Sequence, residues 1–129
     1  MIPLCLHDEI GVLPWSPLAR GWLTGSRTRE GERRTIRAET DSFGDSLYGP
    51  DDFDVVDRLD EVAGERGLPP AQMALAWLLH RPGVTAPIVG ATKLDHLEDA
   101  LAAAELELSD GEIAALEEPY RPHPVIGHS

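Results

Sequence analysis

The chain has 129 residues, a formal net charge of −12 at pH 7 and one cysteine, Cys5. This acidity excludes general binding to nucleic acid or to an anionic membrane, because both require a positively charged protein surface. One cysteine cannot form an internal disulfide. No apolar run is long enough to span a membrane and no signal peptide opens the sequence, so we expect a cytoplasmic location.

A short apolar run near the start, Ile10–Leu13, follows the predicted end of a helix at residues 1–9. Such a run is typical of a strand buried on both faces, and Pro14 suits its end because proline has no N–H. The next residues, from Trp15 to Gly21, include an aromatic ring, a hydroxyl and a cation. At the carboxyl end of a strand in an α/β fold, this combination indicates a ligand site. The alternative is a buried strand with an ordinary Pro/Gly turn, in which Trp15 belongs to the core.

A polar connection at residues 26–50 carries five of the eleven cationic side chains of this acidic chain. A solvated loop is the more ordinary interpretation of so long a connection. Together with Arg20, however, its arginines would suit a loop that closes over a phosphorylated ligand. These arginines are Arg27, Arg29, Arg33, Arg34 and Arg37.

Two amphipathic helices are predicted in the next part of the chain. The first begins at Pro50–Asp51 and ends at Gly67, and the second covers residues 71–80 after two prolines. Apolar residues recur on one face of each helix, so we expect both helices to pack on a core that includes Met73 and Trp77.

A second apolar run, Val84–Val89, is predicted to be a strand that leads into Gly90. A helix begins at once, with Thr92 as its cap and Asp95 at the third helical position. A glycine turn, free N–H groups at a helix start and a lysine together favour the binding of a phosphate group. Lys93 is the only lysine in the chain, which favours a function for it over an ordinary solvated charge.

The last predicted helix begins at a capping box formed by Ser109 and Glu112. Residues 119–129 are expected to form an irregular tail. His123 and His128 in this tail have no neighbouring cluster of carboxylates or cysteines, so we predict no metal site.

Two motifs at the predicted strand ends resemble those of the aldo-keto reductases, in the branch with bacterial NADPH-dependent reductases and channel β-subunit-like proteins. They are Trp15-Ser16-Pro17-Leu18-Ala19-Arg20-Gly21 and Ile88-Val89-Gly90-Ala91-Thr92-Lys93. The segment Gln72-Met73-Ala74-Leu75-Ala76-Trp77-Leu78-Leu79 is similar to the family's helix before its last strand. The resemblance covers nearly the whole chain.

The resemblance implies one partial α/β domain over residues 1–129, the C-terminal part of a TIM (β/α)8 barrel. In this barrel Ile10–Leu13 would be the seventh strand and Pro87–Val89 the eighth. The expected parts of the domain are a helix end, strand and cofactor-binding turn (1–25), a loop (26–50), helices with the last strand (51–118) and a C-terminal tail (119–129).

The resemblance also implies a binding site for NADPH or NADP. In the family, an aromatic ring at the position of Trp15 stacks on the nicotinamide ring. Residues that match the pyrophosphate-binding segment are Ser16, Pro17, Leu18, Arg20 and Gly21. Residues that match the adenosine-phosphate turn and the adenosine end are Gly90, Thr92, Lys93, His96 and Asp99. Ala100 replaces the asparagine common in the family, which puts one adenine hydrogen bond in doubt.

The activity implied by the resemblance is the reduction of aldehydes or ketones to alcohols, but the chain matches none of the family's catalytic residues. The catalytic aspartate, tyrosine, lysine and histidine come from the first half of the barrel. We therefore predict no catalytic residue, and interpret the chain as the cofactor-binding portion of an NADPH-dependent reductase of small carbonyl substrates. The alternatives are a non-catalytic nucleotide-binding or regulatory module and a truncated, inactive gene product. Exposed strand edges would favour self-association or a complementing fragment.

Overall fold

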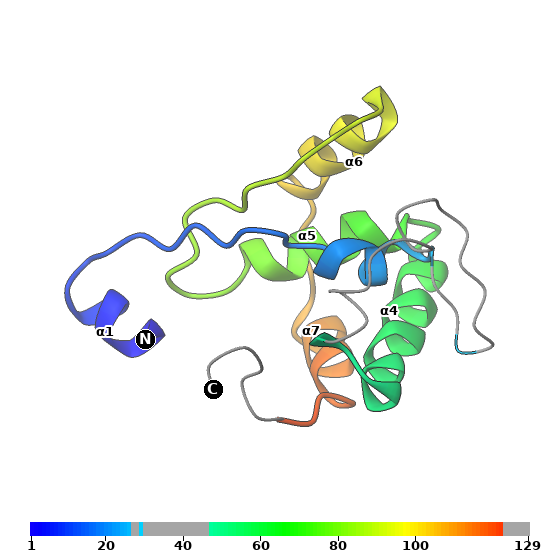
Figure 1. The fold of residues 1–129 in the computed structure, drawn as a ribbon, viewed down its shortest axis with the longest axis horizontal. Coiled ribbons are helices and arrows are strands. Elements are labelled where there is room, and N and C mark those ends of the chain that lie inside the picture. The colour runs from blue at the N-terminus through cyan, green and yellow to red at the C-terminus, as the bar shows by residue number, and fades with distance from the viewer. Residues whose placement is uncertain (27–28, 30–46, 123–129) are drawn as a thin grey trace.

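The computed structural model describes residues 1–26, 29 and 47–122. Helices are its main secondary structure (Figure 1). In chain order they are α1 (Ile2–His7), the 3₁₀ helices η1 (Ala19–Thr24) and η2 (Pro50–Asp52), α4 (Phe53–Arg66), α5 (Pro70–Leu79), α6 (Leu94–Ala103) and α7 (Asp110–Glu117).

Several helix boundaries lie where the sequence predicts them. Gly67 ends α4 in the left-handed conformation (φ 65°, ψ 32°), which glycine adopts without a steric penalty. Pro70 opens α5, where its missing N–H leaves no helical hydrogen bond unmade. The predicted cap of α6 is wrong, because Lys93 rather than Thr92 is the N-cap residue and no side chain caps this helix start.

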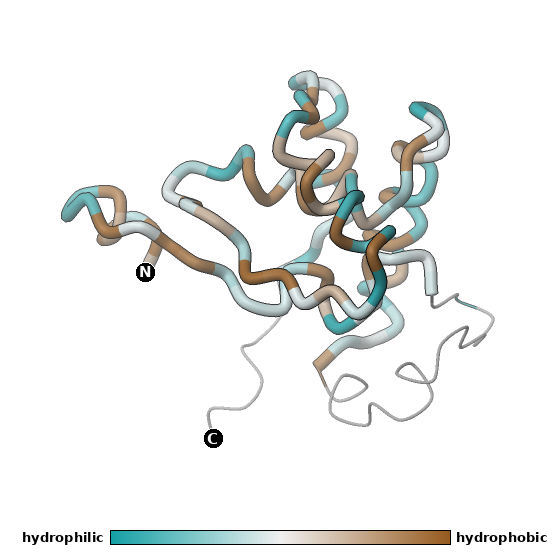
Figure 2. Tube along the Cα trace, turned by 90° about the horizontal axis from the view of Figure 1, so that it is seen from above, coloured by the Kyte–Doolittle hydropathy of each residue, from teal (hydrophilic) through white to brown (hydrophobic). Residues whose placement is uncertain are grey.

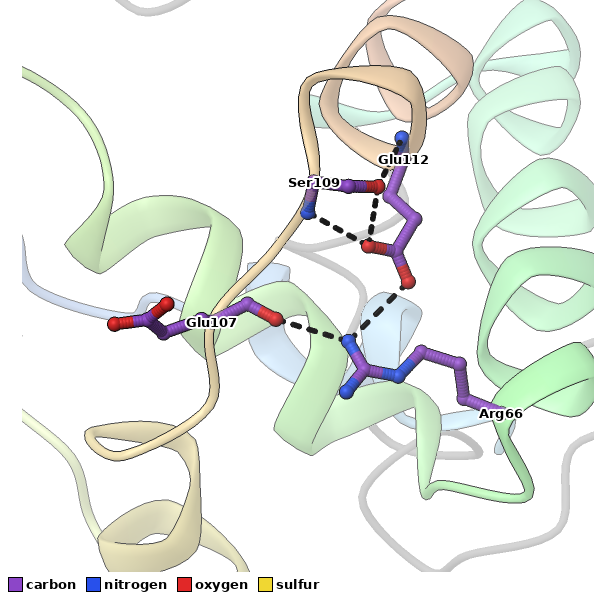
Figure 3. A network of polar contacts seen from close by, with 4 residues as sticks. All are labelled: Arg66, Glu107, Ser109 and Glu112. Carbon is purple, nitrogen blue, oxygen red and sulfur yellow. Dashed lines mark hydrogen bonds and ion pairs between the residues drawn. The ribbon is translucent and has the colours of Figure 1, made fainter.

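The predicted capping box at the start of α7 is confirmed, and it belongs to a wider polar network (Figure 3). The Glu112 N–H donates to Ser109 Oγ at 3.3 Å, and the Ser109 N–H donates to the Glu112 carboxylate at 2.7 Å. Arg66, at the end of α4, donates to the Glu107 carbonyl at 3.0 Å and to the Glu112 carboxylate at 3.2 Å. The hydrogen bonds from Ser109, assisted by Arg66, hold the pKa of Glu112 below its ordinary value.

The hydrophobic core lies between α4, α5, α6 and α7. Met73 and Leu75 are its largest fully buried side chains, which confirms the predicted place of Met73. Trp77 packs against this core but stays half-buried, and its indole N–H donates to the Glu117 carboxylate at 3.0 Å. On α4 the buried residues recur at helical spacing, as predicted: Val56, Leu59, Val62 and Ala63.

Two extended segments, residues 10–15 and 84–88, run side by side and form what we call the paired arm (Figure 1). Two isolated parallel bridges join them, Val12 with Val84 and Trp15 with Ile88. Three backbone hydrogen bonds accompany these bridges: Val12 N–H to the Gly83 carbonyl at 3.1 Å, Thr85 N–H to the Val12 carbonyl at 2.9 Å, and Ile88 N–H to the Pro14 carbonyl at 2.8 Å.

The predicted fold class is wrong, because the described residues contain no β-strand and only these two isolated bridges. Neither Ile10–Leu13 nor Pro87–Val89 is a strand of a TIM barrel in this structure. Two parallel strands without further partners are only marginally stable, since the outer edge of each lacks hydrogen bonds. Pro14 and Pro87 also remove two backbone donors from the arm. The described chain is therefore mostly helical, with two extended segments that bond at separate points.

Large apolar side chains of α6 and the arm are exposed. Figure 2 shows the hydrophobic residues along the chain in brown. On α6, Leu94, Leu97 and Leu101 are 68%, 45% and 65% exposed, and their spacing places them in one stripe. The other exposed apolar side chains of α1 and the arm are Ile2, Leu4, Leu6, Ile10, Leu13, Trp15 and Ile88. Within the part of the chain that the structure describes, no helix has the length and apolar character needed to cross a membrane. The cytoplasmic location stays a prediction.

Candidate cofactor site

Two loops leave the paired arm at the same end, because its two segments run parallel. Trp15, which ends the first segment, is bridged to Ile88, which ends the second. The chain then enters the first loop at Ser16 and the second at Gly90. The two loops, which are far apart in the sequence and carry the residues predicted to bind one cofactor, therefore begin close together in space.

The first loop contains an unusual amount of left-handed backbone. Ser16, Ala19 and Arg20 have φ values of 52°, 49° and 56°, although residues with side chains seldom adopt this region. Gly21 follows with a φ of 98°. The Ala19 N–H donates to the Ser16 carbonyl at 3.0 Å, and the Gly21 N–H donates to the Leu18 carbonyl at 2.9 Å. The loop is therefore a compact bend whose shape is held by internal hydrogen bonds.

The helix η1 attaches this loop to the helical core. Trp22 is 5% exposed, and its ring centroid lies 4.8 Å from that of Phe53 and 5.2 Å from that of Tyr48. Leu18 and Leu23, on either side of Arg20 and Gly21, pack against the core cluster. The bend thus has a fixed base, which is what a preorganised binding loop requires.

Trp15 stands at the entrance of the first loop with 71% of its surface exposed. The alternative interpretation, in which Trp15 belongs to a buried core, is wrong. An exposed indole offers a flat apolar surface that suits stacking on a planar ring. Ser16 and Pro17, the next predicted cofactor residues, are half-buried.

The second loop leads directly into α6 and carries the only lysine of the chain. Gly90, Thr92 and Lys93 are exposed, and a Cβ added at Gly90 would meet no atom within 4 Å. The space around Gly90 is therefore open to a ligand. Asp95, in the first turn of α6, is the opposing charge at this helix start. A phosphate bound here would gain from the Lys93 ammonium and the helix dipole, and lose from Asp95.

Two further predicted cofactor residues lie on α6 itself. His96 is exposed and Asp99 is half-buried. Residues three apart share one face of a helix, and helical geometry places this face opposite the exposed leucine stripe. The two faces of α6 therefore carry different chemistry.

Among the predicted loop arginines, only Arg29 falls in the described residues. Its guanidinium donates to the carboxylates of Asp57 and Asp54, each at 2.8 Å, and these hydrogen bonds raise the pKa of Arg29. Arg29 is thus engaged by α4 rather than held ready for a phosphate. The remaining arginines of the hypothesis lie outside the described residues: Arg27, Arg33, Arg34 and Arg37.

An apolar hollow of about 590 Å³ borders the first loop, with Pro17 and Leu23 in its lining. The rest of its wall comes from α4, α5 and α7, together with Tyr120. Of the predicted cofactor residues, Pro17 alone is among those that line it. Across the described ranges, we find no group of three or more His, Cys, Asp or Glu side chains that could hold a metal ion.

The sequence analysis missed two hydroxyl groups in the first loop. Thr24 Oγ1 and Ser26 Oγ both donate to the Gly21 carbonyl, each at 2.8 Å. Their positions three and five residues after the glycine were visible in the sequence. Serine and threonine hydroxyls commonly form hydrogen bonds with backbone groups a few residues away.

Comparisons with known proteins give a consistent result. A model of the Aldo/keto reductase family matches residues 1–121. The chain is 44% identical over 128 residues to a putative aryl-alcohol dehydrogenase of Schizosaccharomyces pombe, covering 98% of this chain and 35% of that protein. It is 42% identical over 132 residues to an aldo-keto reductase of Fusarium vanettenii, covering 100% of this chain and 34% of that protein. It is 38% identical over 126 residues to a versiconal hemiacetal acetate reductase of Aspergillus parasiticus, covering 95% of this chain and 36% of that protein.

The chain thus spans about a third of the length of these curated relatives. The family match extends from residue 1 through α7, so it includes both loops of the candidate site.

Proposed function

The chain belongs to the aldo/keto reductase family, and on this premise we propose that it is the NADPH-binding portion of an oxidoreductase that reduces aldehydes and ketones to alcohols. Members of this family generally use NAD(P)H. The family match and the reductase and dehydrogenase relatives support the proposal of an oxidoreductase. The choice of NADPH and the contribution of this chain to the reaction are our proposals.

One observation carries the proposal. The parallel pairing of Trp15 with Ile88 starts the two loops from one end of the arm, with an exposed aromatic ring at the first loop and an exposed lysine in the second. A nicotinamide dinucleotide has a planar ring at each end and phosphates between these rings, and NADPH carries a further phosphate on its adenosine. An extended cofactor lying across both loops would therefore meet a stacking surface and then a cation.

In this arrangement each residue contacts the part of the cofactor that suits its chemistry. Trp15 stacks on the nicotinamide ring, while the half-buried side chains of Ser16 and Arg20 contact the pyrophosphate. The N–H groups of Ala19 and Gly21 are engaged inside the loop, so they shape it and do not bind phosphate. Lys93 pairs with the phosphate at the adenosine end. The bound nicotinamide supplies a hydride, and the residues of this chain hold and orient its ring.

We assign no residue of this chain to proton donation. A general acid must lie within hydrogen-bond reach of the substrate oxygen. The ring of Tyr48 packs on Trp22 in the helical core, and Tyr120 lies after α7 beside the apolar hollow. Neither position matches a catalytic residue of the family, and we expect no carbonyl reduction by this chain alone.

A second candidate function is a non-catalytic nucleotide-binding or regulatory module. It is favoured by the same observation, since the proposed binding groups are present in the described chain while a proton donor beside Trp15 is not assigned. The two candidates differ in the reaction and agree on the cofactor. Measuring binding and turnover separately distinguishes them.

We also propose that the exposed apolar side chains of α6 and the arm are covered by a complementing polypeptide or by a second copy of the chain. Ten large apolar side chains of α1, the arm and α6 are at least 41% exposed, which is unfavourable for an isolated monomer. Light scattering on the 129-residue chain should show association or a loosely packed state. A compact monomer with a sharp, cooperative melt would contradict this proposal.

The experiment for the main proposal is a calorimetric titration of the chain with NADPH, beside an assay of NADPH oxidation with an aryl aldehyde. The relatives named aryl-alcohol dehydrogenases make such an aldehyde the first substrate to try. Trp15→Ala should weaken NADPH binding by about 2- to 10-fold, the range expected for loss of an aromatic stacking contact. Tyr120→Ala removes another exposed ring, 55% exposed, as the matched control. Equal weakening by both variants, or no binding by the parent chain, would overturn the proposal.

A further inference from the structure

The Gly21 carbonyl receives two hydroxyl donors from further along the chain. Thr24 Oγ1 and Ser26 Oγ each lie 2.8 Å from this oxygen, which is a good distance for an O–H···O hydrogen bond. Both side chains are half-buried. One carbonyl with two lone pairs is thereby fully occupied by protein groups.

These hydrogen bonds act on the most strained part of the loop. Ala19, Arg20 and Gly21 are consecutive residues with φ values of 49°, 56° and 98°. Left-handed backbone is unfavourable for Ala19 and Arg20, so it persists only where surrounding contacts enforce it. Gly21 is the last residue of this run, and a fixed Gly21 carbonyl fixes the peptide that closes it.

The donors come from the anchored end of the loop. Trp22 and Leu23, which lie between Gly21 and Thr24, are held by the core. A Cβ added at Gly25 would lie 3.7 Å from Pro70, so the chain between the two hydroxyl residues runs close to the start of α5. The two hydroxyls therefore tie the exposed bend to a part of the loop that the helices hold in place.

We infer that Thr24 and Ser26 are positioning residues of the cofactor loop, whose hydroxyls hold the bend at residues 19–21 in its binding shape before a nucleotide arrives. This inference rests on the proposed function, since it assigns these hydroxyls to the same site. Neither side chain is required to touch the nucleotide. Preorganisation of this kind raises affinity because less order has to be created on binding.

The test is a set of hydroxyl variants of the 129-residue chain, titrated with NADPH by calorimetry. Thr24→Val keeps the shape of the side chain and removes the donor, so the dissociation constant should rise by about 3- to 10-fold, the range for one neutral hydrogen bond. Ser26→Ala should act in the same direction. Thr24→Ser restores the donor and should bind like the parent. Ser109→Ala, which removes a hydroxyl contact at the start of α7, is the control and should leave NADPH affinity unchanged.

A second measurement separates this inference from the proposed function. Amide hydrogen exchange at residues 18–23, followed without nucleotide, should be faster in Thr24→Val and Ser26→Ala and unchanged in Thr24→Ser and Ser109→Ala. If the parent chain does not bind NADPH, the proposed function fails and exchange alone decides whether the hydroxyls hold the bend. Unchanged exchange in both donor-less variants would overturn the inference. Faster exchange in Thr24→Ser as well would also overturn it, because the loss would then belong to the methyl group of Thr24.

Discussion

The helical core and the paired arm contain similarly apolar sequence, but they expose it very differently. Met73 and Leu75 on α5 are 0% and 2% exposed, whereas Leu13 and Trp15 on the arm are 57% and 71% exposed. A helix bonds its own backbone within one segment, so α4, α5 and α7 need only each other's apolar faces. An extended segment needs neighbours on both edges, and the arm offers one. The stability of the chain is therefore concentrated in the helices, while most of the proposed cofactor residues lie on or beside the arm.

The largest difference in stability between the two regions is expected when a buried side chain of the core is truncated. Met73→Ala removes a fully buried side chain and should lower the free energy of unfolding by about 2–5 kcal/mol. In the dissociated chain, Leu13→Ala shortens an exposed side chain of the arm and should change the free energy of unfolding by no more than about 0.5 kcal/mol. Urea unfolding at low protein concentration, followed by circular dichroism, measures both. A loss of similar size for Leu13→Ala in the dissociated chain would show that Leu13 packs within the chain itself.

The sequence predicted the helical half of this contrast well. Gly67, Pro70 and the Ser109–Glu112 box act within one or two turns of the chain, so local chemistry decides their structure. The apolar spacing of α4 likewise identified its buried face. These features depend on contacts that a single helix and its nearest partners supply.

The arm and its loops were predictable only in part. The apolar runs at 10–13 and 84–89 lack the sheet neighbours that would make them strands, and the number of such neighbours is not a local property. The pairing of Trp15 with Ile88 and the attachment of Thr24 and Ser26 to one carbonyl also depend on tertiary geometry. The cap of α6 was assigned to Thr92 on spacing alone, and the chain begins that helix one residue later.

The next effect tests whether the arm end and α6 serve binding rather than stability. If Lys93 faces the adenosine 2′-phosphate, which NADH lacks, Lys93→Glu should weaken the binding of NADPH by about 1.5–3 kcal/mol more than that of NADH, because a charge-assisted contact is lost. Lys93 is exposed, so the free energy of unfolding should change by no more than about 0.5 kcal/mol. Calorimetric titration with both cofactors measures the difference.

Arg121→Glu supplies the control for Lys93→Glu, because it changes the net charge equally at an exposed residue after α7. Arg121→Glu should leave the affinities for NADPH and for NADH unchanged. Equal losses for NADPH and NADH in Lys93→Glu would identify Lys93 as a solvated charge at a helix start.

A smaller effect is expected from closing the gap between the two segments of the arm. A Cβ at Gly11 would lie 2.5 Å from Thr85 Oγ1, so Gly11→Ala forces one segment or the Thr85 side chain to shift. We expect the free energy of unfolding to fall by about 1 kcal/mol. This value is at the low end for overpacking, because Thr85 is exposed and its side chain can move aside. Exchange of the Thr85 N–H, which donates to Val12, reports the change. Thr85→Ala in the same chain should restore slow exchange, and failure to do so would show that the segments are not in contact in solution.

The smallest effect concerns the network between α4 and α7, where a charge rather than a packed side chain is at stake. Hydrogen bonds from Ser109 and the ion pair with Arg66 lower the pKa of Glu112 in the folded chain. A lowered folded pKa means that the carboxylate contributes stability above the ordinary glutamate pKa and loses it as the pH falls through the folded value.

Glu112→Gln keeps an oxygen that accepts from the Ser109 N–H but removes the charge. It should lower the free energy of unfolding by about 0.5 kcal/mol near neutral pH, a typical value for an exposed charge pair, and flatten its decline in acid. Ser109→Ala removes the side-chain cap and should cost about 1 kcal/mol, while the acid dependence due to the backbone N–H of residue 109 and to Arg66 remains. An unchanged acid dependence in Glu112→Gln would show that other carboxylates govern the stability of this end of the core.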